Sequence, residues 1–141
     1  MEKPRLVLDT NVVLSAIIKP DGLQRLIFQV ALSPFCEVFI SAPILAEYEG
    51  VLSRKRFKFQ PDEVQAVINL ITSKAVLVTP TNTVTAASDS DDNMFLECAE
   101  KAEANYLVTG NKKHFPAKWK KTKVVSGREI MDLMLRGLLE P

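Results

Sequence analysis

The sequence predicts an α/β protein with three layers, in which a mainly parallel central sheet of four to five strands lies between helices. Segments typical of strands and of helices alternate along the chain, as they do in parallel sheets with crossover helices. The strand candidates are short aliphatic runs without a polar face, which is typical of strands buried on both sides. The 141 residues show no repeat and no linker, so we predict one domain over residues 1–141.

One strand and two helices are expected within the first 32 residues. Residues 5–8 are a short β-branched and aliphatic run, which is typical of a central strand. A polar turn at residues 9–11 opens an apolar helix over residues 12–18, which ends at a Pro-Asp-Gly turn. A second helix is predicted over residues 23–32, because a Ser-Pro pair follows it.

The middle of the chain is predicted to contain two strands and two helices. Residues 37–40 form the second strand, and Pro43 suits the first turn of a helix that runs to about residue 53. Pro61 opens a further helix, because apolar residues follow it at the spacing i, i+3, i+4 and i+7. Residues 75–78 form the third strand.

The last part of the chain begins with a threonine-rich stretch, residues 79–87, that we predict to be a loop. An acidic segment follows and opens a helix over residues 94–103. Residues 106–109 form the fourth strand, and residues 124–125 are the candidate for a fifth. The last helix is predicted over residues 128–138.

Cysteine use and hydropathy restrict the class of protein. Cys36 and Cys98 are too far apart for a zinc ribbon or a redox motif, so we predict two buried thiols. The N-terminus lacks the pattern of a signal peptide, and no apolar run reaches the roughly 18–20 residues that cross a bilayer. We therefore expect a cytoplasmic protein without a membrane segment.

The net charge of +1 does not by itself indicate nucleic-acid binding, but the basic residues are unevenly placed. Residues 104–127 contain lysines and no acidic side chain, and residues 54–58 form a second basic cluster. A basic stretch beside an acidic site would neutralise a phosphate backbone, although a solvated loop explains the same pattern. The lysines assigned to RNA binding are Lys112, Lys113, Lys120 and Lys121.

Polar side chains follow successive predicted strands. Asp9 follows the first strand, Glu47 lies in the helix after the second, Asp92 precedes the helix after the third, and Asn111 follows the fourth. In open parallel sheets, sites form beyond the carboxyl ends of the strands, at a switch in strand order. Clustered carboxylates need protons or a cation, and hard oxygen ligands suit Mg²⁺ or Mn²⁺. The sequence therefore predicts a divalent-metal site.

Each of these residues also has a purely structural interpretation. Asp9 and Asp92 precede helices, where aspartate is a favoured cap. Glu47 and Glu49 flank the apolar stripe of one helix on opposite sides, so periodicity does not choose between them. The asparagine after the fourth strand is of a type common in turns, and His114 is interpreted as a surface residue.

Four segments, taken in order, resemble the motifs of PIN domains, and most closely those of the VapC-like toxin components of toxin–antitoxin pairs. These segments are Leu6–Asn11, Ile44–Glu47, Asp91–Leu96 with Ala99, and Leu107–Asn111. The resemblance implies a metal-dependent endoribonuclease that leaves a 5′-phosphate and a 3′-hydroxyl. It also implies a homodimer and a protein antitoxin that covers the site.

The resemblance further assigns roles to individual residues. The three acidic positions of the catalytic metal site are matched by Asp9, Glu47 and Asp92. Asn111 matches a fourth metal-site position that is usually aspartate, and the missing charge puts a second metal ion in doubt. Thr109 matches a supporting hydroxyl, and Asn11 matches a position that orients the first aspartate.

Other classes of protein would carry different residues at these positions. A catalytically weak PIN-fold module that binds RNA or protein is the alternative, and the uncharged residue at position 111 favours it. A dehalogenase-like phosphatase would need a second aspartate where this chain has Asn11, and no P-loop motif is present. A metal-free ribonuclease would typically use histidines for acid–base catalysis, and this chain has a single histidine.

Overall fold

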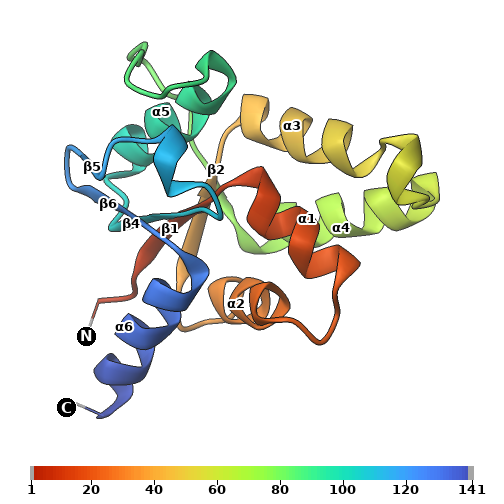
Figure 1. The fold of residues 1–141 in the computed structure, drawn as a ribbon, viewed down its shortest axis with the longest axis horizontal. Helices are drawn as coiled ribbons and strands as arrows, with labels where there is room; N and C mark the ends of the chain where they lie inside the picture. Colours follow the sequence, from red (N-terminus) through yellow and green to blue (C-terminus); the bar gives the residue numbers. More distant parts are fainter. Residues whose placement is uncertain (1, 140–141) are drawn as a thin grey trace.

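The computed structural model describes residues 2–139 and has the layered architecture expected from the sequence (Figure 1). Its sheet has the strand order β3-β2-β1-β4-β6-β5. The strands are β1 (Arg5–Leu8), β2 (Glu37–Ile40), β3 (Val76–Leu77), β4 (Tyr106–Val108), β5 (Lys118–Trp119) and β6 (Thr122–Val125). Neighbouring strands are parallel except for β5 and β6, which form an antiparallel hairpin.

The α/β class and the mainly parallel sheet are confirmed, but the predicted number of strands is too low. The sheet has six strands, and the missing one is β5. This strand has two residues and is joined to β6 by a tight turn, in which Lys120 has a left-handed backbone with φ of 54°. So short an edge strand leaves no alternation of apolar and polar residues for the sequence to reveal.

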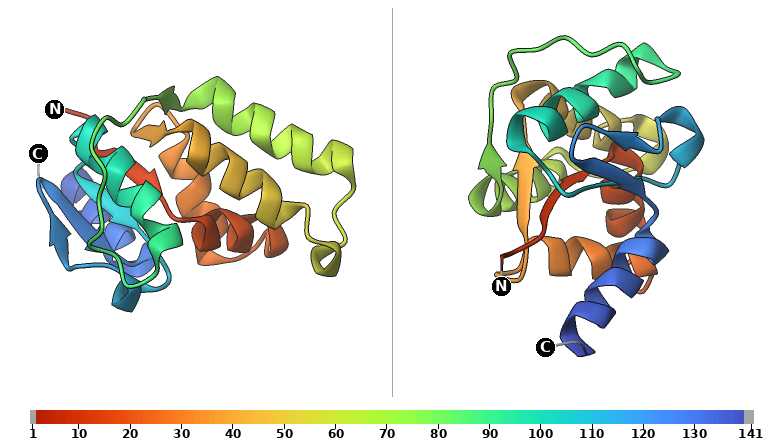
Figure 2. Two further views of the ribbon diagram at one scale, coloured as in Figure 1. Left: turned by 90° about the horizontal axis from the view of Figure 1, so that it is seen from above. Right: turned by 90° about the vertical axis from the view of Figure 1, so that its left-hand side faces the viewer.

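The helices form a layer on each face of the sheet (Figure 2). They are α1 (Thr10–Ile18), α2 (Leu23–Ala31), α3 (Ala42–Leu52), α4 (Pro61–Lys74), α5 (Asn93–Ala102) and α6 (Gly127–Leu139). Helix α5 packs on β1, β2 and β4, whereas α2 packs between α1 and α6 on the opposite face, as right-handed crossovers require. Helices α3 and α4 pack side by side and extend beyond the sheet (Figure 1). Short 3₁₀ helices connect these elements: η1 (Lys55–Phe57), η2 (Ser90–Asp92) and η3 (Lys112–His114).

The centre of the sheet is fully apolar and holds the ends of β1 and β4 in place. Its most buried side chains, each at most 1% exposed, are Leu6, Val7, Leu8, Leu107 and Val108. Burial of each such side chain stabilises the fold by about 1.5–3 kcal/mol. Because the chain leaves β1 toward β2 and leaves β4 toward β6, the strand order switches between β1 and β4. A site is therefore expected beyond the carboxyl ends of these two strands.

Two simpler expectations can be compared with the structure. Cys36 and Cys98 are both buried free thiols, as predicted. Within residues 2–139, no helix combines the length and the apolar character that a membrane span requires.

Candidate functional site

Asp9 is the first residue beyond β1 and lies at the strand-order switch. Its backbone N–H donates to the carbonyl of Val108 at 2.9 Å, which extends the ladder between β1 and β4 by one residue. Its Oδ1 accepts a hydrogen bond from the backbone N–H of Thr10 at 2.7 Å, and its Oδ2 accepts one from Thr109 Oγ1 at 2.7 Å. The residue caps α1, but capping uses only one carboxylate oxygen. Asp9 is 6% exposed, so its second oxygen faces a buried, polar environment.

The charge of Asp9 is held in an unfavourable position. Burial raises the pKa of Asp9 from 3.8 to about 6, although the hydrogen bond from Thr109 lowers it, and the nearby charge of Asp92 raises it further. Two carboxylates that repel each other in a partly dry site are stabilised by protons or by a cation. The geometry therefore suits a group that brings positive charge.

Thr109 is the rigid support of this site. Its residue is fully buried, and its backbone N–H donates to the carbonyl of Val125 at 2.9 Å, which continues the β4–β6 ladder. Its hydroxyl donates to Asp9 and accepts the backbone N–H of Asn111 at 2.9 Å. One side chain therefore ties the carboxylate to the loop after β4.

The two asparagines of the site have different positions. Asn11 lies in the first turn of α1, and its Oδ1 accepts the backbone N–H of Gly110 at 3.1 Å. The hydrogen bonds to the Asp9 side chain come instead from Thr10 and Thr109, so Asn11 holds the neighbouring loop. Asn111 has φ of −128° and an exposed side chain, which removes the left-handed turn conformation as the reason for an asparagine here.

Asp92 ends η2 and immediately precedes α5, but it does not act as a cap. Its side chain forms no capping hydrogen bond, whereas Asp89 accepts the backbone N–H of Asp91 at 3.0 Å and caps η2. The carboxylate of Asp92 is 19% exposed and its Oδ2 lies 3.4 Å from Nδ1 of His114. Burial, more than the charge of Asp89, raises the pKa of Asp92, and His114 lowers it. The interpretation of Asp92 as the side-chain cap of α5 is therefore wrong.

Glu47 lies on the predicted helix, α3. It is half-buried on α3, whereas Glu49 is exposed. The adjacent Tyr48 is buried, and its hydroxyl donates to the carbonyl of Leu8, which fastens α3 to the end of β1. Among residues 2–139, no three or more histidine, cysteine or carboxylate side chains are arranged to hold a metal ion. The structure thus brings Asp9, Asp92 and Thr109 together but does not add Glu47 to a ready-made ligand group.

The four lysines assigned to RNA binding lie in two places. Lys112 and Lys113 belong to η3, beyond the carboxyl end of β4, where Lys112 Nζ lies 2.7 Å from Glu129 Oε1. Lys120 and Lys121 lie in the turn before β6, at the amino end of the parallel strands. There, Lys121 Nζ lies 2.8 Å from Glu103 Oε2 and the Lys120 ammonium lies 5.2 Å from the Trp119 ring centre. The two pairs therefore lie at opposite ends of the parallel strands β4 and β6.

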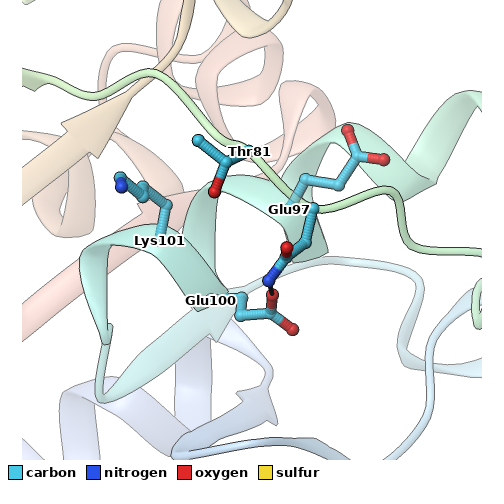
Figure 3. Close-up of a pocket in the computed structure, with 5 residues that line it drawn as sticks. Thr81, Glu97, Glu100 and Lys101 are labelled. Carbon is cyan, nitrogen blue, oxygen red and sulfur yellow. Dashed lines mark hydrogen bonds between the residues drawn. The ribbon is translucent and has the colours of Figure 1, made fainter.

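A separate polar pocket on α5 is structural (Figure 3). It is lined by Thr81, Asn82, Glu97, Glu100 and Lys101. Glu100 accepts hydrogen bonds from Asn82 Nδ2 at 2.5 Å and from Trp119 Nε1 at 3.1 Å, and Glu97 accepts one from the backbone of Val84 at 3.0 Å. These glutamates fasten the loop that leads to Asp92, and Trp119 is an anchor rather than a free platform for a nucleobase.

The fold and the site define the class of protein. It is an α/β protein with a mainly parallel sheet and a buried aspartate where the strand order switches. The PIN domain family model matches residues 5–113, and the chain belongs to the PIN domain family. Proteins of this family are generally nucleases that depend on divalent metal ions. The matched range ends one residue before His114.

Individual relatives agree with this assignment. The chain is 30% identical to the uncharacterized protein MJ1680 of Methanocaldococcus jannaschii over 113 aligned residues. The alignment covers 78% of this chain and 72% of the relative. A chain of VapBC2 from Rickettsia felis, solved with a DNA fragment from its promoter, aligns with a TM-score of 0.60 and 18% identity over 86% of this chain and 98% of the other. A chain of FitAB bound to IR36 DNA aligns with a TM-score of 0.56 and 15% identity over 86% and 94%. At these identities, the two solved structures show a shared fold.

Proposed function

We propose that this chain is a Mg²⁺- or Mn²⁺-dependent endoribonuclease that acts as the toxin of a toxin–antitoxin pair. The observation that carries the proposal is the pair of aspartates at the switch point, Asp9 and Asp92. Burial raises the pKa of both carboxyls, and the charge of Asp92 raises the pKa of Asp9 further, so neither is a favourable isolated anion. Hard carboxylate oxygens are the ligands that Mg²⁺ and Mn²⁺ prefer.

The donor set fits such an ion, although the third carboxylate must move. Asp9 and Asp92 would hold the metal, and Glu47 would join them after a change of side-chain rotamer, since it is only half-buried on α3. Asn111 offers an amide oxygen from an exposed side chain beyond β4. A bound divalent ion would lower the pKa of water and neutralise charge on a phosphate.

The protein residues contribute orientation and charge. Thr109 keeps one oxygen of Asp9 turned toward itself, so the carboxylate presents a fixed edge. Lys112 and Lys113 lie beyond the same end of β4 and would contact the phosphates of an RNA strand. Lys120 and Lys121 stay predictions from the sequence, and their position at the other end of the strands does not add support.

The role as a toxin and the assembly with other chains rest on the family. The VapBC2 and FitAB structures contain related folds in two-component complexes, which supports a protein antitoxin for this chain. A homodimer is proposed on the same basis. Expression of the chain should arrest growth, and co-expression of an adjacent small reading frame should relieve that arrest. Arrest that is equal for the wild type and Asp92→Asn would contradict a nuclease toxin.

A PIN-fold module that binds RNA or protein without cleaving it is the second candidate. Two observations favour it: position 111 carries no charge, and residues 2–139 contain no ready-made group of three metal-binding side chains. In that case, RNA would bind equally well with and without a divalent ion.

Cleavage of an end-labelled single-stranded RNA separates the two candidates. We expect cleavage with Mn²⁺, none with EDTA, and products that carry a 3′-hydroxyl. Glu47→Gln should remove cleavage, whereas the matched variant Glu49→Gln on the same helix should keep it. RNA binding without metal-dependent cleavage would favour the module, and equal activity of both glutamine variants would remove Glu47 from the site.

A further inference from the structure

The loop after β4 brings a side chain to the acidic site that neither the sequence patterns nor the matched family range assigns. His114 ends η3, and its Nδ1 lies 3.4 Å from Asp92 Oδ2. The imidazole is 49% exposed and the Asp92 side chain is 19% exposed, so the contact lies where the site meets solvent. The imidazole lowers the pKa of both acidic residues of the site, Asp92 and Asp9.

The backbone around His114 is held more firmly than its exposure suggests. The N–H of His114 donates to the carbonyl of Asn111 at 3.0 Å, and its carbonyl accepts the N–H of Ser88 at 2.9 Å. The Ser88 hydroxyl also donates to the carbonyl of Lys113 at 3.4 Å. The following Phe115 is buried in the core. These contacts join η3 directly to the segment that leads into Asp92.

The carboxylate of Asp92, in contrast, receives nothing from its own helix. It forms no capping hydrogen bond at the start of α5, and the neighbouring cap of η2 is made by Asp89. A carboxylate whose torsion angles are not restrained locally is oriented by whichever donor faces it. In this structure, the group that faces it is Nδ1 of His114, at an ion-pair distance of 3.4 Å from Oδ2.

We propose that His114 is a positioning residue, which holds the Asp92 carboxylate in the orientation that binds the divalent ion. The inference rests on the proposed function and extends it. Partners of this kind, which orient a metal ligand without touching the metal, typically contribute 10- to 100-fold to affinity. Because both side chains are partly exposed, we expect an effect near the lower end, about tenfold.

The two amide replacements of histidine give a sharp test. In His114→Asn, the side-chain amide lies near the place of Nδ1 and can still donate to Asp92. In His114→Gln, the amide reaches the place of Nε2, on the other side of the ring. Calorimetry of Mn²⁺ binding without RNA should show a loss of about tenfold in affinity for His114→Ala and His114→Gln. His114→Asn should restore most of the affinity.

Further measurements separate positioning from folding. The thermal midpoint of the metal-free protein should be nearly equal for the three variants, because Ser88 bonds to the backbone carbonyl of His114 and not to its side chain. In RNA cleavage, kcat at saturating Mn²⁺ should recover in His114→Asn and not in His114→Gln.

Each other outcome counts against the proposal. Unchanged Mn²⁺ affinity in His114→Ala would show that His114 does not orient Asp92 for metal binding. Tighter binding in His114→Ala would show that the ring competes with the metal. Recovery by glutamine instead of asparagine would mean that the opposite ring nitrogen matters. If the wild type itself neither binds Mn²⁺ nor cleaves RNA, the proposed nuclease function fails, which is a separate result.

Discussion

Replacement of Asp9 by asparagine should make the metal-free protein more stable while it removes activity. Burial raises the pKa of this carboxyl from 3.8 to about 6, so the folded state binds its proton more tightly than the unfolded state does. Ionisation of Asp9 therefore costs stability, and the cost grows as the pH rises from about 4 to about 6. At 1.36 kcal/mol per pKa unit, a shift of about two units corresponds to about 3 kcal/mol at neutral pH.

The asparagine does not recover all of this free energy. Its amide accepts from one of the two donors, Thr10 or Thr109, and turns an NH₂ group toward the other. The loss of one such hydrogen bond costs about 1 kcal/mol. We therefore expect Asp9→Asn to be more stable than the wild type by about 2 kcal/mol near pH 7, which raises the thermal midpoint by roughly 4–8 °C in a chain of this size.

Thermal unfolding between about pH 3.5 and 8 in EDTA measures this effect. The advantage of Asp9→Asn should disappear below about pH 4, because the wild-type carboxyl is then protonated in both states. Asp91→Asn, which removes an exposed charge beside the site, is the matched control and should change the midpoint little. Saturating Mg²⁺ should stabilise the wild type and not the variant. The reasoning would be refuted if Asp9→Asn were no more stable than the wild type at neutral pH. It would also be refuted if the difference in thermal midpoint were as large below about pH 4 as at neutral pH.

Three further substitutions address the support of the site. Thr109→Val removes the hydroxyl that donates to Asp9 and should raise the pKa of that carboxyl further, so the acid limb of the cleavage–pH profile should move to higher pH; an unmoved limb would contradict this. Tyr48→Phe leaves the buried carbonyl of Leu8 without its donor and should cost about 1–3 kcal/mol in urea unfolding, whereas a change below 0.5 kcal/mol, roughly the scatter of surface substitutions, would exclude a strong bond. Asn111→Asp should tighten Mg²⁺ binding in calorimetry, and unchanged affinity would remove Asn111 from the metal site.

The parts of the fold that the sequence predicted well are those in which one physical requirement acts alone. Strands β1 and β4 are buried on both faces, so their residues are aliphatic throughout and are visible as short apolar runs. Asp9 could be located for the same reason, since it is the polar residue that directly ends such a run. The edge strand β5 could not be located, because one exposed and one half-buried residue show no periodicity.

The parts of the site that the sequence missed depend on how loops return to the sheet. His114 was interpreted as a surface residue, and its exposure agrees with that interpretation, but the fold of η3 turns its ring toward Asp92. Nothing in the spacing of residues 92 and 114 indicates this contact, which arises because both segments cross the same edge of the sheet. Capping preferences favoured a cap role for Asp92, but its side chain forms no capping hydrogen bond at α5, and Asp89 caps only the preceding η2.

The separation of the basic residues, in contrast, follows from the predicted topology. Strands β4 and β6 are parallel, so the connection between them begins at the carboxyl end of the sheet and must finish at the amino end. Lys112 and Lys113 lie at the start of this connection, and Lys120 and Lys121 lie at its finish. The two lysine pairs therefore lie at opposite ends of the sheet although they are close in sequence, because a connection between parallel strands runs the length of the sheet. Under the proposed function, an RNA strand bound at Asp9 would lie beside the end of the sheet that carries the first pair, and it would meet the second pair only by extending to the other end.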